Sequence, residues 1–150
     1  MSATSVLVEG ERASLSGRVG RLTPASPAKW GRMDAGQMLR HTAEALRMAL
    51  GELPVRPAGK RFFHARLVKY LMIRVLPFPK GAPTAPELRV AEPVAFEAER
   101  ARWLGLLSRF GSAPPSGVGA EHPLFGPLTW QEWGELQYKH LDHHLKQFGV

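Results

Sequence analysis

The sequence predicts an all-α protein, a bundle of four long helices with an additional N-terminal helix and long loops rich in proline and glycine. Three observations support this prediction. Apolar residues recur every three or four positions in several segments, as they do on one face of a helix. Two of these segments begin with a capping-box pattern, and most of the 13 prolines lie between the segments. We therefore expect a single domain over residues 1–150, which is long enough to bury a hydrophobic core.

The first two helices are predicted over residues 10–22 and 35–51. Two glycines inside the first segment weaken that prediction, because glycine disfavours a helix interior. The second helix has a clear start signal. Asp34 is placed to accept a hydrogen bond from the first turn, and Gln37 follows three residues later, as a capping box requires.

The third and fourth helices are predicted over residues 60–76 and 93–110, and Pro77 ends the third one. Each carries an apolar spine at helical spacing that we expect to face the core. The spine of the third helix consists of Phe63, Leu67, Tyr70, Leu71 and Val75, and that of the fourth consists of Phe96, Trp103, Leu106, Leu107 and Phe110.

The fifth helix is predicted over residues 130–148. Thr129 and Glu132 form a second capping box at its start. Gly149 is placed to end it, because helices often end at a glycine in the left-handed conformation.

Two long loops separate the last three helices. Residues 77–86 contain four prolines, and residues 111–127 are rich in glycine and proline. Loops of this length are uncommon unless they cover a site or an interface. We expect the connection over residues 77–91 to be irregular but ordered or semi-rigid.

The composition excludes several function classes. The chain has no cysteine, which excludes disulfides, thiolate nucleophiles and cysteine-based zinc sites. It has no apolar stretch of about 18 residues that would span a membrane and no secretory signal, so we expect a cytoplasmic protein. The net charge of +7 would suit nucleic acid, but the basic residues are scattered and no nucleic-acid-binding motif accompanies them. We expect neither nucleic acid nor a membrane as a partner.

Three of the six histidines lie within five residues near the C-terminus, at His140, His143 and His144. On an ideal helix, His140 and His144 are about 40° apart around the axis and about 6 Å apart along it. Both imidazoles can then reach one metal ion with bonds of about 2.0–2.1 Å. Spacing alone also allows the pair His140 and His143, which are about 60° apart. Asp142 points away from His140 and is a poor ligand for the same ion.

A third ligand is available in the second predicted helix. His41 lies on the stripe formed by Met38, Ala45 and Met48, so it faces the core. Burying three imidazoles costs free energy unless each is satisfied, and one shared ion would satisfy all of them. Two simpler explanations remain open: His41 is a hydrogen-bonded core residue, and the C-terminal histidines interact with the helix dipole.

Three further residues are candidates for a catalytic role: His143, Glu44 and His122. Glu44 is one turn from His41, and together with His143 it is the nearest candidate for proton transfer or for a hydrogen bond to a metal ligand. His122, just before the fifth helix, is expected to cap a turn or to line a pocket. His64 is expected on the exposed side of the third helix.

Several segments carry a resemblance to a known family, and together they cover most of the chain from about residue 22 onward. These segments are residues 30–33, 37–41, 79–81, 84–88 and 122–129, Trp133, and residues 140–149, of which the last is the most specific. On these residues the chain resembles the DinB/YfiT-like superfamily of metal-dependent four-helix-bundle proteins, and most closely a branch of unknown function.

The resemblance implies a metal ion held by one histidine of the second helix and by two histidines spaced by four on the last helix. In this chain these are His41, His140 and His144, so the resemblance favours His144 over His143 as the partner of His140. It also implies that homodimers are common. Some members of the superfamily are transferases or isomerases that use low-molecular-weight thiols, whereas many have no known reaction.

These observations lead us to expect a metal-dependent enzyme that acts on a small molecule, as a thiol-dependent transferase or isomerase or as a hydrolase. Three protein ligands leave one coordination position for water or substrate. Since the chain has no cysteine, a thiol would be an external cosubstrate. Histidine ligands suit zinc, nickel, iron or copper. The alternative is a non-catalytic helical-bundle binding protein with a structural or vacant histidine site.

A di-iron carboxylate site of the ferritin type is excluded. Such a site needs a glutamate from each of four helices, including two Glu-x-x-His motifs, and the sequence contains no such motif.

Overall fold

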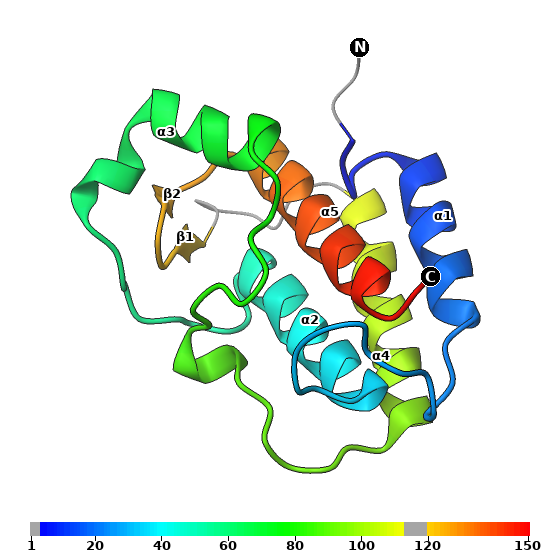
Figure 1. Cartoon of the computed structure of the whole chain (residues 1–150). Coiled ribbons are helices and arrows are strands. Elements are labelled where there is room, and N and C mark those ends of the chain that lie inside the picture. The colour runs from blue at the N-terminus through cyan, green and yellow to red at the C-terminus, as the bar shows by residue number, and fades with distance from the viewer. Residues whose placement is uncertain (1–3, 113–119) are drawn as a thin grey trace.

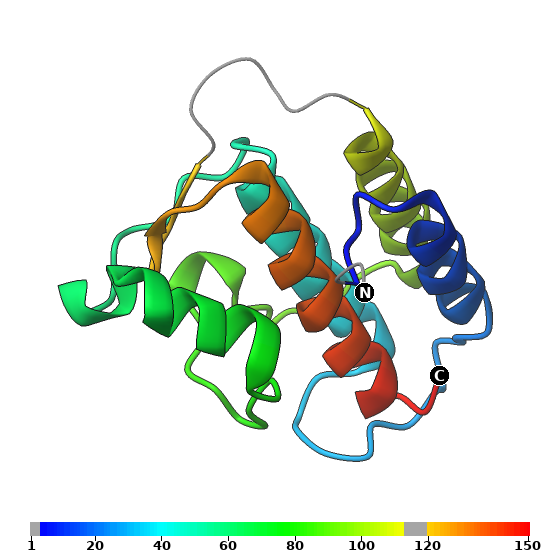
Figure 2. The same cartoon turned by 90° about the horizontal axis from the view of Figure 1, so that it is seen from above.

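Four helices enclose the core of the protein, as Figure 1 shows. They are α1 (Glu9–Gly20), α2 (Ala35–Ala49), α4 (Phe96–Ser108) and α5 (Trp130–Gln147). The computed structural model describes residues 4–112 and 120–150. Helix α2 packs against α4 and α5, and α1 packs against the same two helices (Figure 2). Within the described ranges, no helix is both long enough and apolar enough to cross a membrane.

Both predicted capping boxes are confirmed. The Asp34 carboxylate accepts a hydrogen bond from the backbone N–H of Gln37 (2.7 Å), and the Gln37 side chain accepts one from the backbone N–H of Asp34 (3.0 Å). Thr129 and Glu132 make the same reciprocal pair at 3.1 and 2.8 Å. Gly149 has a φ of 79°, the left-handed conformation expected just beyond a helix. Because their ends are well marked, α2 and α5 begin at the predicted residues.

The inward face of α4 forms a large part of the core. Trp103 is fully buried, and its indole N–H donates to the Thr42 hydroxyl of α2 at 2.9 Å. A buried indole needs such an acceptor, so this bond fixes α4 against α2. The predicted spine of the fourth helix is confirmed, since its members are all buried: Phe96, Trp103, Leu106, Leu107 and Phe110.

The third predicted helix, over residues 60–76, is wrong as a single long element. The chain forms a 3₁₀ turn (Arg61–His64), a short helix α3 (Arg66–Tyr70) and a π turn (Leu71–Val75). The break falls at Ala65, whose ψ of 135° is extended. This segment lies at the edge of the molecule (Figure 1), and α1 takes the place among the four core helices that the sequence had suggested for it.

The predicted spine of the third helix is also wrong. Leu67 is 68 % exposed and Val75 is 56 % exposed, whereas Ile73, outside the predicted spine, is only 4 % exposed. The segment is anchored from the Ile73 side, where the Lys139 amino group of α5 donates to the backbone carbonyls of Met72 (2.6 Å) and Ile73 (3.3 Å). Periodicity identified the residues that share a face, but the face that packs inward is a different one.

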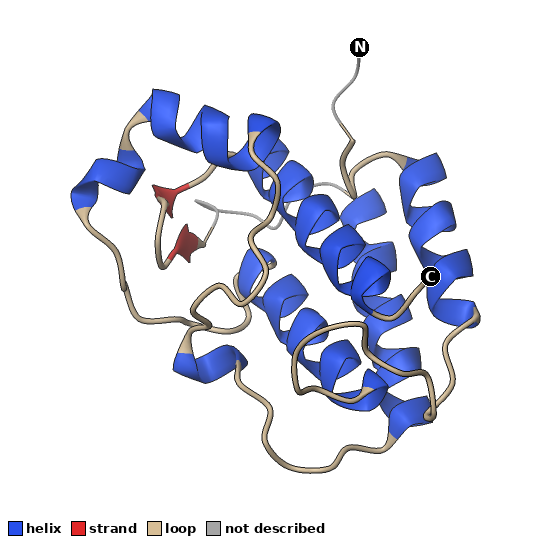
Figure 3. Ribbon diagram, viewed as in Figure 1, coloured by secondary structure: helices blue, strands red, loops and turns tan. Residues whose placement is uncertain are grey.

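A small antiparallel sheet departs from the all-α prediction (Figure 3). Strands β1 (Glu121–His122) and β2 (Gly126–Pro127) pair with Glu121 opposite Pro127 and His122 opposite Gly126. Strands of two residues are too short to show an alternating pattern, which explains why the sequence did not reveal them. The predicted loop at 111–127 includes residues 113–119, which lie outside the described residues.

The connection over residues 77–91 is irregular, as predicted, and part of it packs against α2. It contains one 3₁₀ turn (Pro86–Leu88), which contacts α2 and buries Leu88. This contact brings the backbone of the connection to the face of α2 that carries His41.

Replacing Asp34 with alanine tests the α2 capping box. We expect Asp34→Ala to lower the free energy of unfolding by about 1 kcal/mol, because the carboxylate that accepts the hydrogen bond from the backbone N–H of Gln37 is lost. Urea denaturation measures the difference. Asp34→Ser retains an acceptor at this position and is the matched control; a Ser variant as unstable as the Ala variant would contradict the capping account.

Candidate metal centre

Two helices bring three histidines together. His41 projects from α2, and His140 and His144 project from α5. The ring centroids are 5.0 Å apart for His41 and His140, 4.8 Å for His41 and His144, and 4.8 Å for His140 and His144. One ring nitrogen of each lies within 4.8 Å of the others. The structure therefore places the three predicted ligands close enough to hold one metal ion.

A backbone carbonyl fixes the tautomer of His41. The Nδ1 atom of His41 lies 2.9 Å from the carbonyl oxygen of Leu88. Because a carbonyl oxygen only accepts hydrogen bonds, Nδ1 must carry the proton. The lone pair of the neutral ring is then on Nε2, which faces His140 at 3.1 Å from its Nε2 atom.

A side-chain amide fixes the tautomer of His144 by the same logic. The Nε2 group of Gln147 donates to the carbonyl oxygen of Trp30 at 2.6 Å, so its Oε1 is the atom that faces His144. This oxygen lies 2.8 Å from Nδ1 of His144, and Nδ1 must donate to it. The lone pair of His144 is therefore also on Nε2. Metal-binding histidines commonly donate their second N–H to such an acceptor.

The 3.1 Å separation between Nε2 of His41 and Nε2 of His140 fits two ligands of one ion. Two nitrogens at about 2.0–2.1 Å from a tetrahedral ion are about 3.3 Å apart. The same distance also fits a direct N–H···N hydrogen bond, in which His140 would have to donate because Nε2 of His41 carries the lone pair. Which of the two arrangements forms depends on whether a metal ion binds.

All three histidines are held in the neutral form that a metal requires. Burial lowers the pKa of His41, and the hydrogen bond to Leu88 offsets this only in part. Burial, followed by repulsion from His144 and His41, lowers the pKa of His140 well below its usual range. Burial also lowers the pKa of His144 to about 3. Neutral imidazoles near pH 7 bind metal without having to lose a proton.

Aromatic side chains cover one side of the three histidines. Phe78, from the connection after α3, stacks on His140 with ring centroids 5.2 Å apart and an angle of 28° between the planes. The ring centroid of Phe78 is also 4.8 Å from that of His143, and the ring centroid of Trp30 is 5.5 Å from that of His143. His140 and His143 nevertheless remain partly exposed.

His143 lies beside the three ligands. Its ring centroid is 5.1 Å from that of His144. Burial lowers its pKa, with an opposing effect from Asp142 and a further lowering by Lys80 and Lys146. His143 is therefore a neutral ring at the covered edge of the site, where it can accept a proton.

Glu44 makes its contacts elsewhere. Its carboxylate pairs with Arg47 at 2.9 Å and with Arg102 of α4. Arg102 also contacts Glu99 at 3.1 Å. Glu44 thus belongs to a cluster of ion pairs between α2 and α4. None of these ion pairs joins Glu44 to His41.

His122 holds the turn between β1 and β2. Its Nδ1 atom accepts hydrogen bonds from the backbone N–H groups of Leu124 (3.1 Å) and Phe125 (3.2 Å). Burial lowers its pKa to about 4, which keeps the accepting nitrogen unprotonated. The structure therefore gives His122 the capping contact that was one of its two expected roles. His64 is exposed, as expected.

Sequence reasoning missed the groups that orient the ligands. Gln147 is three residues after His144, so it is a helical neighbour, and this spacing was a usable signal. The Leu88 contact comes from a backbone carbonyl, for which side-chain patterns hold no signal. Phe78 lies in the connection that was expected to cover a site, but nothing in the sequence singled it out.

Comparison with known families identifies a family to which the chain is similar. The sequence model of a family described as "Protein of unknown function (DUF1569)" matches residues 14–149, a range that includes all three histidines. No match was found among curated proteins or among solved structures. The match agrees with the expected family of unknown function, whereas the likeness to the DinB/YfiT-like superfamily stays a prediction.

The buried histidines predict a pH-dependent stability. We expect the free energy of unfolding of the metal-free protein to fall as the pH drops below about 6.5, the pKa of histidine in the unfolded chain. Burial lowers the pKa of His144 to about 3 when the chain is folded, so in this window the unfolded chain binds a proton that the folded chain does not. At pH 5 this costs about 2 kcal/mol for His144 alone, and His41 and His140 act in the same direction. Chemical denaturation after chelator treatment measures the effect.

Two variants serve as controls for this pH dependence. His144→Gln removes one of the titrating groups and should flatten the dependence, whereas His64→Gln, at an exposed position, should leave it unchanged. A free energy of unfolding that is constant or higher at pH 5 than at pH 7 would contradict the prediction.

Proposed function

The chain belongs to the DUF1569 family of unknown function, and we propose that it is a metal-dependent enzyme whose divalent ion is held by His41, His140 and His144. The observation that carries the proposal is the pair of fixed tautomers. Leu88 and Gln147 each accept the Nδ1 proton of one histidine, which leaves two Nε2 lone pairs close together. His140 supplies a third ring nitrogen within reach of both.

The donor set indicates the kind of ion. Three imidazoles without sulfur suit zinc, nickel or iron, and they also suit copper. Three protein ligands are typical of catalytic zinc sites, since a structural site is usually closed by a fourth. A divalent ion bound there supplies Lewis-acid chemistry, lowering the pKa of a bound water or thiol or polarising a carbonyl group.

The surrounding residues have separate tasks in this proposal. Phe78 and Trp30 exclude bulk water from one side of the site, and partly exposed His140 and His143 mark the entrance for a small molecule. His143, neutral near pH 7, is the candidate proton acceptor, because it lies beside His144 without being a member of the ligand set.

Gln137 is a further candidate for contact with a bound molecule. It precedes His140 by three residues and His144 by seven, which places it on the same face of α5. Its side chain is buried, and its Oε1 atom has no hydrogen-bond partner among the residues that the structure describes. An unpaired buried acceptor costs about 1–3 kcal/mol, so we infer that Oε1 accepts a hydrogen bond from water or substrate in the site.

The reaction that fits best is a transfer, isomerisation or hydrolysis on a small substrate. The chain has no cysteine, so any thiol in the reaction comes from a low-molecular-weight cosubstrate. The resemblance to the DinB/YfiT-like superfamily supports the thiol-dependent form of this proposal and a homodimeric state. The competing function is a non-catalytic bundle in which His140 donates a hydrogen bond directly to His41.

Metal content of the purified protein separates these two functions. We expect about one divalent ion per chain in the native protein and a loss of most of it in His41→Ala and His144→Ala, because removing one of three ligands weakens a three-ligand site severely. Elemental analysis after purification without chelator measures this. His64→Ala, at an exposed histidine, is the matched control, and full retention of metal in both site variants would contradict the proposal.

A cobalt-substituted protein tests whether a coordination position is open. We expect the visible spectrum of bound Co²⁺ to change when a small thiol is added, with a new sulfur-to-metal charge-transfer band, because three protein ligands leave a fourth position available. A titration with 2-mercaptoethanol measures the change. A spectrum that stays constant at saturating thiol would favour a closed structural site.

A further inference from the structure

One segment of the chain carries nearly all of the large apolar side chains that are exposed in the described part of the structure. Within residues 4–112 and 120–150, seven such side chains are exposed, and six of them lie in the segment of residues 62–76. Large apolar side chains are normally exposed singly. The six are Phe62, Leu67, Tyr70, Leu71, Val75 and Leu76, and we call them the α3 apolar face.

The α3 apolar face is exposed because the segment packs on the rest of the protein through a different side. Ile73 is buried, and Lys139 of α5 binds the carbonyls at the end of the segment. Leu67, Leu71 and Val75 follow one another at intervals of four, so they line one side of the helical turns. Figures 1 and 2 show α3 at the edge of the molecule, away from α1 and α4.

The same part of the chain carries the whole excess of positive charge. Residues 53–86 contain seven Lys and Arg and no Asp or Glu. The chain has 20 basic and 13 acidic residues, so the remainder holds 13 of each and has no net charge. The basic residues that look scattered in the sequence are therefore unbalanced in only one region, the one that exposes apolar side chains.

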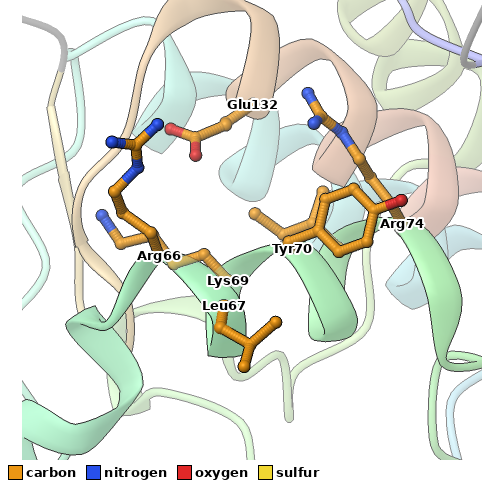
Figure 4. A pocket seen from close by; sticks show the side chains of 7 residues that line it. Arg66, Leu67, Lys69, Tyr70, Arg74 and Glu132 are labelled. Atoms are coloured by element: carbon orange, nitrogen blue, oxygen red, sulfur yellow. The ribbon is translucent and has the colours of Figure 1, made fainter.

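Several of these cations stand directly beside the α3 apolar face. Arg61 and Arg66 are exposed. Arg66, Lys69 and Arg74 line a pocket of about 330 Å³ together with Tyr70 and Glu132 (Figure 4). Arg74 is neutralised in part by Glu135, at 2.6 Å. The Lys69 amino group donates to the backbone carbonyl of Pro127 but keeps its charge in that contact, so Arg66 and Lys69 are the pocket cations whose charge no carboxylate of the described residues balances.

We propose that the α3 apolar face and its flanking cations dock the protein on the surface of a bilayer that contains anionic phospholipid. Apolar side chains that enter the interface beside basic side chains that contact phosphate are the combination that holds amphipathic helices on membranes. Each Lys or Arg near such a surface strengthens binding. The sequence alone led us to expect no membrane partner, because periodicity assigned these apolar residues to the core.

Charge decides between this occupant and two others. Two copies of the chain joined through this face would bring two basic regions together, and like charges repel. Nucleic acid would use the cations, but its binding is dominated by phosphate contacts and would leave six large apolar side chains without a role. A bilayer surface uses both features.

The proposal is independent of the metal site. Leu76 of the α3 apolar face lies two residues before Phe78, which stacks on His140. A docked protein would therefore hold the aromatic cover of the three histidines close to the bilayer surface.

Sedimentation with vesicles tests the docking. The full chain is incubated with phosphatidylcholine vesicles that contain 0 or about 30 mol% phosphatidylglycerol. We expect binding only to the anionic vesicles, and at least about tenfold weaker binding at high salt, since screening shortens the reach of the charges. Arg61→Gln/Arg66→Gln and Leu67→Ser/Val75→Ser should each weaken binding by about tenfold or more.

Two matched control variants accompany the vesicle experiment. Arg21→Gln/Arg32→Gln removes the same charge from exposed positions elsewhere, and Val8→Ser removes an exposed large apolar side chain outside the face. Both variants should bind as the native chain does. No binding to anionic vesicles, or equal losses in the control variants, would overturn the proposal. So would a dimer in solution that Leu67→Ser/Val75→Ser dissociates, or binding to random DNA without binding to vesicles.

The absence of cysteine gives a second readout. Leu67→Cys and Val8→Cys each create a single labelling position in a chain with no cysteine of its own. A polarity-sensitive fluorophore at position 67 should shift to shorter wavelength with anionic vesicles, whereas one at position 8 should not shift. Equal behaviour of the two labels would overturn the proposed orientation.

Discussion

Two hydrogen bonds from histidine Nδ1 atoms are the constraint on which the rest of the site depends. His41 donates to the backbone carbonyl of Leu88 and His144 donates to the side chain of Gln147. Each acceptor forces a tautomer, and each tautomer leaves a lone pair on Nε2. Without these acceptors, neutral imidazoles would be free to turn either nitrogen inward. The site is thus defined by which nitrogen carries a proton as much as by which residues are histidines.

This constraint explains why irregular segments of the chain are held in fixed positions. The connection between α3 and α4 supplies the Leu88 carbonyl and the Phe78 ring, and the segment before α2 supplies the Trp30 carbonyl that orients Gln147. The helices bring the three imidazoles together, while the loops determine their orientation and limit the access of water. Loops that position functional groups on a helical scaffold are a common arrangement.

The sequence was sufficient for the parts of the fold and of the site that depend on local patterns. Capping boxes located the starts of α2 and α5, and helical spacing brought His140 and His144 to one face. The sequence was insufficient where the structure depends on a contact with a distant part of the chain. The apolar stripe around Leu67 identifies one face of a helix, but only the packing against α5 shows that this face is exposed. The acceptor for His41 is a backbone atom distant in sequence, which no residue pattern encodes.

The central claim is that three imidazoles bind one divalent ion, and X-ray absorption at the metal edge of the native protein tests it most directly. The account predicts a first shell with three imidazole nitrogens at about 2.0–2.1 Å and one further light ligand, with the imidazole contribution reduced in His140→Ala. A shell of oxygen ligands alone, or a native protein that binds no metal at all, would contradict the account. In the second case the 3.1 Å contact between His41 and His140 is a direct hydrogen bond.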